Sequence, residues 1–224
     1  MTTKNCIENF FGRKKVFLPV IHPISRLHAL RSLAVAREGG ADGVFLINQG
    51  MHTGKTLALL DDFLANVDFW IGVNILGADV QTLVPKLVRN LMPQGVWSDR
   101  ADPLVDRHGW SGLYFGGVAF KYQQMVRPED EAREIHRART SALVDVVTTS
   151  GPGTGEPADL DKVRRMKEIL GADPLAIASG ITPDNVRQYT PHVDVFLVAT
   201  GIEQSVGVFD PDKLRRVADA IHEE

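Results

Sequence analysis

The chain is poor in the features that would place it outside a reducing compartment or in a membrane. Cys6 is the only cysteine in 224 residues, which excludes a disulfide within the chain. The N-terminal sequence MTTKNCIENFFGRKK lacks the apolar core of a signal peptide. No apolar run reaches the roughly 20 residues that a membrane span needs. We therefore expect a cytoplasmic protein without a membrane partner.

A large excess of charge of one sign is also lacking. The chain carries 25 Lys and Arg against 28 Asp and Glu, a formal net charge of -3. This balance gives no general attraction to nucleic acid. The basic pairs Arg164/Arg165 and Arg215/Arg216 have acidic neighbours, as is typical of a solvated helix face. We expect no nucleic-acid partner.

Motifs for metals and nucleotides are missing as well. The seven histidines include no i, i+4 pair and no Cys/His cluster, so the spacing predicts neither a transition-metal site nor a cofactor. Gly54-Lys55-Thr56 is similar to the end of a P-loop, but Gln49 stands where the first glycine of that motif belongs. A loop after a strand is the favoured interpretation. A Mg²⁺ ion held by Asp99 and a substrate phosphate stays open.

Short apolar runs, in contrast, recur along the whole chain. Near-continuous apolar runs are typical of parallel strands that are buried on both faces. Without a linker rich in Pro, Gly or Ser, we expect one domain over residues 1–224, with residues 1–14 as an N-terminal extension. The eight runs are VFLPVI from Val16, GVFLIN from Gly43, FWIGVNI from Phe69, GVWS from Gly95, GLYFGGV from Gly112, LVDVVTT from Leu143, PLAIAS from Pro174 and VDVFLVA from Val193.

Helical patterns separate most of these runs, for example over residues 25–38 and 159–170. Alternating strands and helices indicate a parallel sheet, and eight units predict an α/β fold of the (β/α)8 TIM-barrel type. Only DPLVDRHGW separates the fourth and fifth runs, so we expect a degenerate fourth helix. An open doubly wound sheet is the alternative, but its dinucleotide glycine signature is missing after the first strand.

The sequence LAIASGITPDNVRQYTPHVDVFLVATGIE contains two apolar strands that each end in glycine. Glycine allows main-chain N–H groups to approach an anion closely, and late strands of a barrel commonly supply a phosphate site. We therefore expect a phosphorylated small-molecule ligand. The alternative is that each glycine only closes a turn. The candidate ligand-binding residues are Ser179, Gly180, Ile181, Gly201 and Ile202, followed by a helix expected to start at Thr182-Pro183.

The segment VTTSGPGTGEPADLDKVRRMKEILGADPLAIASGITPDNV resembles the BtpA-like family of barrel proteins and, more distantly, phosphoribosylanthranilate isomerase. VIHP around His22 and WIGVNILG around Asn74 are similar to that family's first and third strands, whereas residues 94–127 match poorly. The resemblance implies a barrel. The BtpA-like family is associated with photosystem I accumulation, which implies a role without catalysis as an alternative to an enzyme.

The isomerase uses a cysteine base after its first strand and an aspartate acid after its sixth. His22 and the run Thr148-Thr149-Ser150 stand at those places here, so the resemblance does not carry over that catalytic pair. Asp145 lies near the start of the sixth run, at the end opposite to the expected site.

Three titratable side chains are candidate catalytic groups because each follows an expected strand. Lys121 is a candidate Schiff-base former, general acid or phosphate cation, and the alternative is an exposed loop lysine. Asp99 is a candidate base or hydroxyl ligand, or else part of a turn with Asp102-Pro103. His22 is a candidate base near neutral pH, or a side chain that packs at the barrel mouth.

Further polar and glycine positions complete the candidate site. Asn48 and Asn74 follow the second and third strands and are candidates for binding a substrate oxygen or for satisfying the loop backbone. A glycine-rich turn contains Ser150, Gly151 and Gly153. This turn is either a lid with N–H donors for the ligand or a chain reversal without a binding role. We expect an enzyme acting on a phosphorylated sugar or phosphoribosyl-type compound, or a non-catalytic metabolite-binding barrel; a homo-oligomer stays open.

Overall fold

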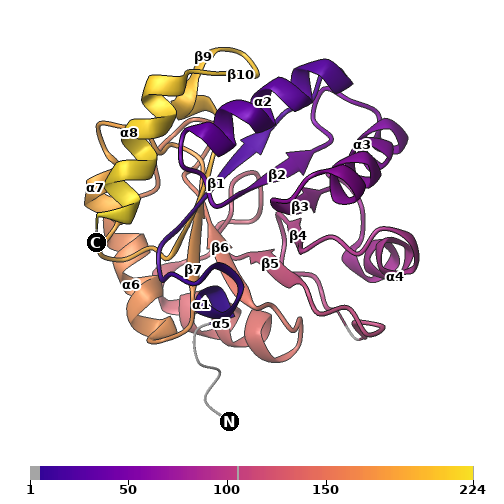
Figure 1. Cartoon of the computed structure of the whole chain (residues 1–224). Helices are drawn as coiled ribbons and strands as arrows, with labels where there is room; N and C mark the ends of the chain where they lie inside the picture. The colour runs from indigo at the N-terminus through magenta and orange to yellow at the C-terminus, as the bar shows by residue number, and fades with distance from the viewer. Residues whose placement is uncertain (1–5, 105, 224) are drawn as a thin grey trace.

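The computed structural model describes residues 6–104 and 106–223 and shows a closed barrel of eight parallel strands surrounded by helices (Figure 1). Neighbouring strands pair in chain order, and β8 pairs with β1 to close the barrel. This architecture confirms the predicted TIM barrel. The strands are β1 (Val16–Ile21), β2 (Gly43–Ile47), β3 (Trp70–Asn74), β4 (Gly95–Ser98), β5 (Leu113–Gly117), β6 (Val146–Thr149), β7 (Leu175–Ala178) and β8 (Val195–Val198).

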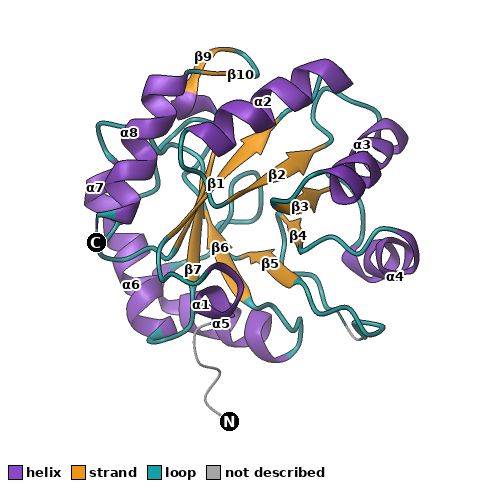
Figure 2. Ribbon diagram, in the orientation of Figure 1, coloured by secondary structure: helices purple, strands orange, loops and turns teal. Residues whose placement is uncertain are grey.

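Helices follow most strands and form the outer layer (Figure 2). The sequence predicts a degenerate fourth helix. In the described residues between β4 and β5 no helix forms at all. The helices are α1 (Cys6–Phe11), α2 (Arg26–Glu38), α3 (Thr53–Asn66), α4 (Val80–Asn90), α5 (Glu131–Thr140), α6 (Leu160–Leu170), α7 (Val186–Tyr189) and α8 (Pro211–His222), with 3-10 turns η1 (Pro128–Asp130) and η2 (Thr200–Ile202) and a hairpin of β9 (Glu203–Ser205) and β10 (Val208–Phe209).

The barrel interior is filled by large apolar side chains, with aromatic rings on one side. Phe45 makes edge-to-face contacts with Trp70, Trp97 and Phe115 at ring-centroid distances of 5.3, 5.7 and 5.1 Å. Such contacts stabilise the core beyond the area that they bury. The interior is therefore a packed core, and space for a ligand lies at its mouth.

A repeated pairing at the N-terminal ends of the strands organises the barrel. The residue just before each even-numbered strand accepts a hydrogen bond from a main-chain N–H of the preceding odd-numbered strand, and its own N–H donates to the carbonyl of that same residue. The side chain thus satisfies a backbone donor that the pleat leaves unpaired. The four pairs are Asp42 with Phe17, Gln94 with Ile71, Asp145 with Tyr114, and Asp194 with Leu175.

Helix α1 closes the N-terminal end of the barrel. Ile7 is fully buried among the interior side chains, and the ring of Phe11 lies 5.2 Å from that of Trp70. Phe10 remains 40% exposed. Part of the expected N-terminal extension therefore belongs to the core, while residues 1–5 lie outside the described residues.

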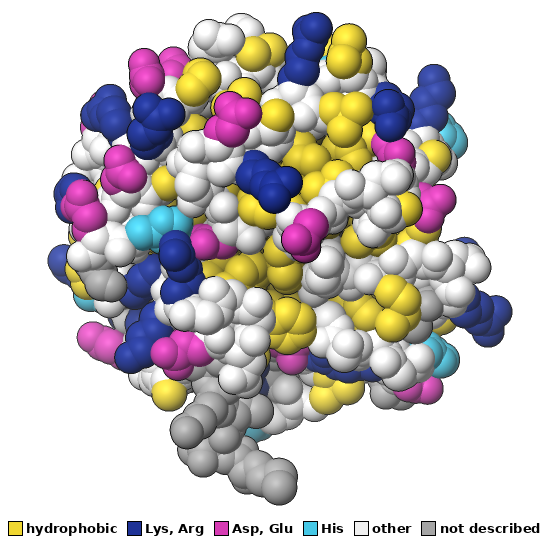
Figure 3. All heavy atoms as spheres, in the orientation of Figure 1, with side chains coloured by type: hydrophobic (Ala, Val, Ile, Leu, Met, Phe, Trp, Pro, Cys, Tyr) yellow, Lys and Arg dark blue, Asp and Glu magenta, His cyan; other side chains and the backbone are white. Residues whose placement is uncertain are grey.

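The surface carries charges of both signs. Basic and acidic side chains are interspersed over the face drawn in Figure 3. None of the described helices has the length and apolar character to cross a membrane.

Candidate functional site

A cavity of about 340 Å³ opens at the C-terminal ends of the strands, the end of a TIM barrel that carries active sites. Its walls are partly apolar, with Trp97 on β4 and Leu197 and Val198 on β8. Seven of the predicted site residues line it, namely His22, Asp99, Lys121, Ser179, Gly180, Ile181 and Gly201. The fold thus brings the catalytic candidates and the glycine turns into one cavity.

Asp99 follows β4 and is held by its neighbours. Its Oδ1 accepts a hydrogen bond of 2.9 Å from Nδ2 of Asn74, and its carbonyl accepts one from Gln123. A Cβ at position 117 on β5 would overlap that carbonyl, so glycine at this position leaves room for the loop that carries Asp99. Burial raises the pKa of Asp99, while the bond from Asn74 and the charge of Lys121 oppose the rise. Burial thus favours the protonated form of this carboxyl more than water would.

Lys121 follows β5 and extends over the ring of Phe120, with Nζ 5.7 Å from the ring centroid. Its main-chain N–H donates a 2.7 Å hydrogen bond to Oγ of Ser150, which fixes its backbone to the β6 loop. Burial lowers the pKa of Lys121, and the charge of Asp99 opposes that change. The two groups are therefore both shifted toward their neutral forms.

Lys162 on α6 binds the loops that follow β5 and β6. Its Nζ donates hydrogen bonds to the carbonyls of Ser150 and Ala119, at 2.6 and 3.1 Å. Burial lowers its pKa as well. Since both of its acceptors are main-chain carbonyls of the β5 and β6 loops, Lys162 fixes the two loops that carry Lys121 and Ser150.

His22 follows β1 at the rim of the cavity. Its Nδ1 lies 3.7 Å from Oε1 of Glu203, the first residue of β9, whose side chain is nearly buried. A carboxylate at this distance can orient the imidazole ring. The structure thus pairs His22 with a carboxylate that the sequence placed only near the glycine turn.

The two glycine turns after β7 and β8 are in direct contact. A Cβ at Gly201 would overlap the carbonyl oxygen of Ile181, which explains why glycine is required there. Both turns line the cavity. In residues 6–104 and 106–223, no acceptor pairs with the main-chain N–H of Gly180, Ile181 or Gly201. Unpaired N–H groups from two adjoining turns are suitable donors for an anion.

The segment after β7 differs from its expected helical form. The N–H of Thr182 donates to Oδ1 of Asn185 at 2.8 Å, and Nδ2 of Asn185 donates to the carbonyl of Gly180 at 2.7 Å. A turn in which the carbonyl of Thr182 accepts from the N–H of Val186 precedes α7, which begins at Val186 and has four residues. Thr182 therefore offers no free N–H, and the side-chain amide of Asn185 holds the turn through both bonds.

The glycine-rich turn after β6 arches over one side of the cavity. Gly151 and Gly153 lie against the backbone and the side chain of Glu156, where a Cβ would overlap them. Thr154 and Gly155 of the same turn line the cavity. Across the opening, the hydroxyl oxygen of Tyr122 accepts a 3.0 Å hydrogen bond from the N–H of Thr154 and lies 3.1 Å from its Oγ1.

Strained backbone gathers around this opening. Ala119, Tyr122 and Ser179 have φ values of 50°, 60° and 97°, in the left-handed region that residues with a Cβ rarely adopt. Ser179 and Tyr122 line the cavity, and Ala119 lies two residues before Lys121. Strain of this kind persists where surrounding structure enforces it, and it clusters at functional sites.

The remaining predicted site residues lie beside the cavity rather than in its lining. Asn48 binds the loop backbone through the N–H of Leu76, and Asn74 is buried against Asp99. Ile202 is fully buried in the core, Ser150 holds the backbone of Lys121, and Gly151 and Gly153 shape the arch. Sequence reasoning did not select Trp97, Gln49, Tyr122 or Thr154 as lining residues, although each follows or ends a strand.

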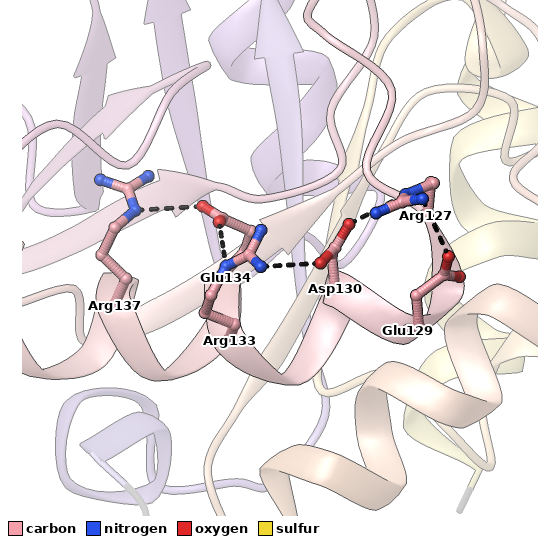
Figure 4. A network of polar contacts seen from close by, with 6 residues as sticks. All are labelled: Arg127, Glu129, Asp130, Arg133, Glu134 and Arg137. Atoms are coloured by element: carbon pink, nitrogen blue, oxygen red, sulfur yellow. Dashed lines mark hydrogen bonds and ion pairs between the residues drawn. The ribbon is translucent and has the colours of Figure 1, made fainter.

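A second, more polar cavity of about 470 Å³ lies outside the barrel near η1 and α5. Three arginines and three carboxylates form a continuous chain of ion pairs there, with N···O distances from 2.8 to 3.3 Å (Figure 4). The charges balance within the network and most of it is exposed, so it adds little stability. Its members are Arg127, Glu129, Asp130, Arg133, Glu134 and Arg137.

The family model of N-(5'-phosphoribosyl)anthranilate (PRA) isomerase matches residues 117–220, from the end of β5 into α8. N-(5'-phosphoribosyl)anthranilate isomerase of Haloferax volcanii is 39% identical over 99 residues, which are 40% of this chain and 44% of the relative. The Haloarcula marismortui isomerase is 38% identical over 128 residues, 53% of this chain and 59% of the relative. The chain thus spans about half the length of these curated relatives.

Solved structures share the fold over nearly the whole chain. N-(5'-phosphoribosyl)anthranilate isomerase from Pyrococcus furiosus superimposes with a TM-score of 0.68 and 14% identity, covering 93% of this chain and 100% of that one. A structure described as native KDPGal gives a TM-score of 0.69 at 17% identity, with coverage of 94% and 96%. At such identities the likeness establishes the barrel alone. The sequence similarity to PRA isomerases is confined to part of the chain, which includes both glycine turns.

Proposed function

We propose that the protein is an enzyme that binds a phosphorylated sugar or phosphoribosyl-type compound in the barrel-mouth cavity. One observation carries the proposal. Two adjoining glycine turns with unpaired N–H groups line the same cavity as three titratable side chains. The match of residues 117–220 to the PRA isomerase family supports a phosphoribosyl-type ligand, because that segment contains both turns. Cytoplasmic location and a homo-oligomeric state stay predictions.

In this proposal the phosphate lies against Gly180, Ile181 and Gly201. Each N–H bond to an anion contributes about 1.5–3 kcal/mol, so two or three of them hold a phosphate without a lysine beside it. The rest of the ligand then extends across the cavity toward Asp99 and Lys121. Asp99 is suited to donate a proton and His22 to accept one. Isomerisation, bond cleavage and phosphoribosyl transfer all use such a pair.

The cavity argues against a simple transfer of the PRA isomerase catalytic pair. Cys6 lies on α1, at the opposite end of the barrel, with Sγ 4.0 Å from the carbonyl of Asp145. The described lining contains no cysteine, and its aspartate follows β4 instead of β6. We therefore propose the ligand class with the reaction type left open between these three.

The test is the thermal stabilisation of the protein by ligand. A ligand that binds only the native state adds about 2.7 kcal/mol of stability at a hundredfold excess over Kd. Ribose 5-phosphate and inorganic phosphate should raise Tm, while ribose should not.

Gly201→Ala should weaken the binding of ribose 5-phosphate about tenfold or more, because the new methyl group separates the two turns. The matched control is Gly54→Ala at the start of α3, where a Cβ meets only ordinary contacts and affinity should not change. Circular dichroism of each unliganded variant checks its fold. Equal affinities in the two variants, or no Tm rise with either phosphate, would contradict the phosphate site.

The resemblance to the BtpA-like family supports a second proposal, a barrel that binds a metabolite without turning it over or that supports another complex. The missing cysteine in the described cavity lining favours it. Binding of ribose 5-phosphate with no consumption of any phosphorylated sugar in a metabolite panel would favour this role over the enzyme.

A further inference from the structure

We propose that the ε-amino group of Lys121 forms a Schiff base with the carbonyl carbon of a phosphorylated aldehyde or ketone held in the barrel-mouth cavity. The inference deepens the proposed function, since it rests on anchoring of the phosphate at Gly180 and Gly201. The ligand in this proposal is the open-chain carbonyl form of an aldose or ketose phosphate.

The first observation is that the contact of the Lys121 amine is with an aromatic ring face, that of Phe120, rather than with an acceptor atom. In the described part of the chain, Nζ of Lys121 makes no hydrogen bond and no ion pair. Other half-buried lysines are tied down: Lys162 binds two carbonyls, and Lys167 binds a carbonyl and the carboxylate of Asp194. A half-buried amine that structure does not use is available for chemistry.

The second observation is the position of that amine. Lys121 lines the same cavity as the glycine turns, and its neighbours there include the apolar Trp97, Leu197 and Val198. Such walls limit the hydration that an ammonium group needs, so burial lowers the pKa of Lys121 and enlarges the fraction of neutral amine. The neutral amine is the nucleophile.

The third observation is an acid placed to complete the step. Asp99 lines the cavity beside Lys121 and is the charge that acts most strongly on it. Burial raises the pKa of Asp99, and Asn74 fixes its carboxyl group through a 2.9 Å hydrogen bond. A carboxyl group held in the cavity with a raised pKa is suited to protonate a leaving hydroxyl.

The chemistry balances without an oxidant or a reductant. The nitrogen lone pair of Lys121 attacks the carbonyl carbon, a C–N bond forms, and a proton moves from nitrogen to oxygen to give a carbinolamine. Asp99 then protonates the hydroxyl, which leaves as water while the nitrogen lone pair closes the C=N bond. The products are a protonated imine, one water and the Asp99 carboxylate. The cationic imine makes the adjacent C–H bond acidic, which suits isomerisation or cleavage.

The test is reductive trapping of the wild-type protein. Ribose 5-phosphate, whose open form is an aldehyde, is mixed with the protein and sodium borohydride, and modified peptides are quantified by mass spectrometry. The hydride reduces the imine to a stable secondary amine. We expect at least about tenfold more adduct on Lys121 than on the exposed Lys55. Inorganic phosphate should suppress the Lys121 adduct, and Lys121→Met should abolish it while Lys55 labelling persists.

The outcomes separate this inference from the proposed function. Labelling of Lys121 no greater than that of Lys55, while ribose 5-phosphate still raises Tm, would overturn the Schiff base and leave the phosphate site standing. Preferential labelling of Lys121 that phosphate does not suppress, without any Tm rise, would support the reactive amine and overturn the phosphate anchor. Neither labelling nor a Tm rise would overturn both.

Discussion

At the scale of single residues, Asp99 and Lys121 are a pair in which each group moderates the shift of the other. Burial raises the pKa of Asp99 and lowers that of Lys121, while their mutual attraction opposes both changes. Buried titratable groups with mutually opposed pKa shifts are common at functional sites. Asn74 keeps the carboxyl group in place.

Asp99→Asn should lower the pKa of Lys121 further, because it removes the negative charge that raises it. A lower pKa means more neutral amine at pH 7, so acetylation of Lys121 by acetic anhydride should become faster relative to Lys55. Peptide mass spectrometry across pH 6–10 gives the apparent pKa.

Asp102→Asn is the matched control, since Asp102 pairs with Arg100 at 3.2 Å and leaves the pKa of Lys121 unchanged. An apparent pKa of Lys121 that is equal to or above the wild-type value in Asp99→Asn would refute the coupling.

At the scale of elements, two loops meet over the cavity. The β5 loop carries Lys121 and Tyr122, and the β6 loop carries the glycine turn. They are joined by the Tyr122–Thr154 bonds on the outside and by Ser150 and Lys162 underneath. The inner bonds are partly buried and the outer ones are exposed, so we expect the outer bonds to open more readily than the inner ones.

Tyr122→Phe removes only the hydrogen bonds between the Tyr122 hydroxyl and Thr154. Because Tyr122 is 77% exposed, the change should leave the free energy of unfolding within about 0.5 kcal/mol of wild type. Amide hydrogen exchange in residues 151–155 should become faster, since the N–H of Thr154 loses its acceptor.

Gln124→Ala is the control for Tyr122→Phe, because Gln124 is an exposed neighbour with no role in the Tyr122–Thr154 hydrogen bonds. Unchanged exchange in the Tyr122→Phe arch would show that the outer bonds do not restrain it.

At the scale of the molecule, the two ends of the barrel have different roles. The N-terminal end is closed by α1 and by the four reciprocal pairs, such as Asp194 with Leu175. The C-terminal end is open and carries the cavity with Asp99, Lys121 and the strained Ser179.

Ile7→Ala should lower the free energy of unfolding by about 3 kcal/mol, because it leaves a cavity in the barrel interior. Phe10→Ala, on the exposed face of α1, should cost less than about 1 kcal/mol. Urea denaturation measures both, and equal losses would show that α1 does not plug the barrel.

The reactivity of the Cys6 thiol on α1 measures the packing of α1 against the barrel. Burial, and then the charge of Asp145, raise the pKa of its thiol to about 11. At pH 8 it should therefore resist iodoacetamide in the wild type and react faster in Ile7→Ala. Rapid labelling of the folded wild type would contradict the docking of α1.

The sequence by itself determined the barrel and the positions of its candidate site residues. Apolar runs such as VFLPVI and GVFLIN are typical of strands buried on both faces, and eight of them, most separated by helical patterns, predict the closed barrel that the structure shows. The end of each strand then faces the site, so His22, Asp99 and Lys121 were recognisable from their place in the chain.

Only the tertiary structure decided how these groups act on one another. The Asn74–Asp99 bond joins residues 25 positions apart, and the reciprocal pairs at the barrel base join each even strand to its odd neighbour. The contacts of Asn185 with Thr182 and Gly180, which fix the turn before the four-residue helix α7, likewise depend on the folded loop. Periodicity records which face a residue occupies, whereas hydrogen bonds, burial and pKa shifts depend on distances between segments that only the closed barrel brings together.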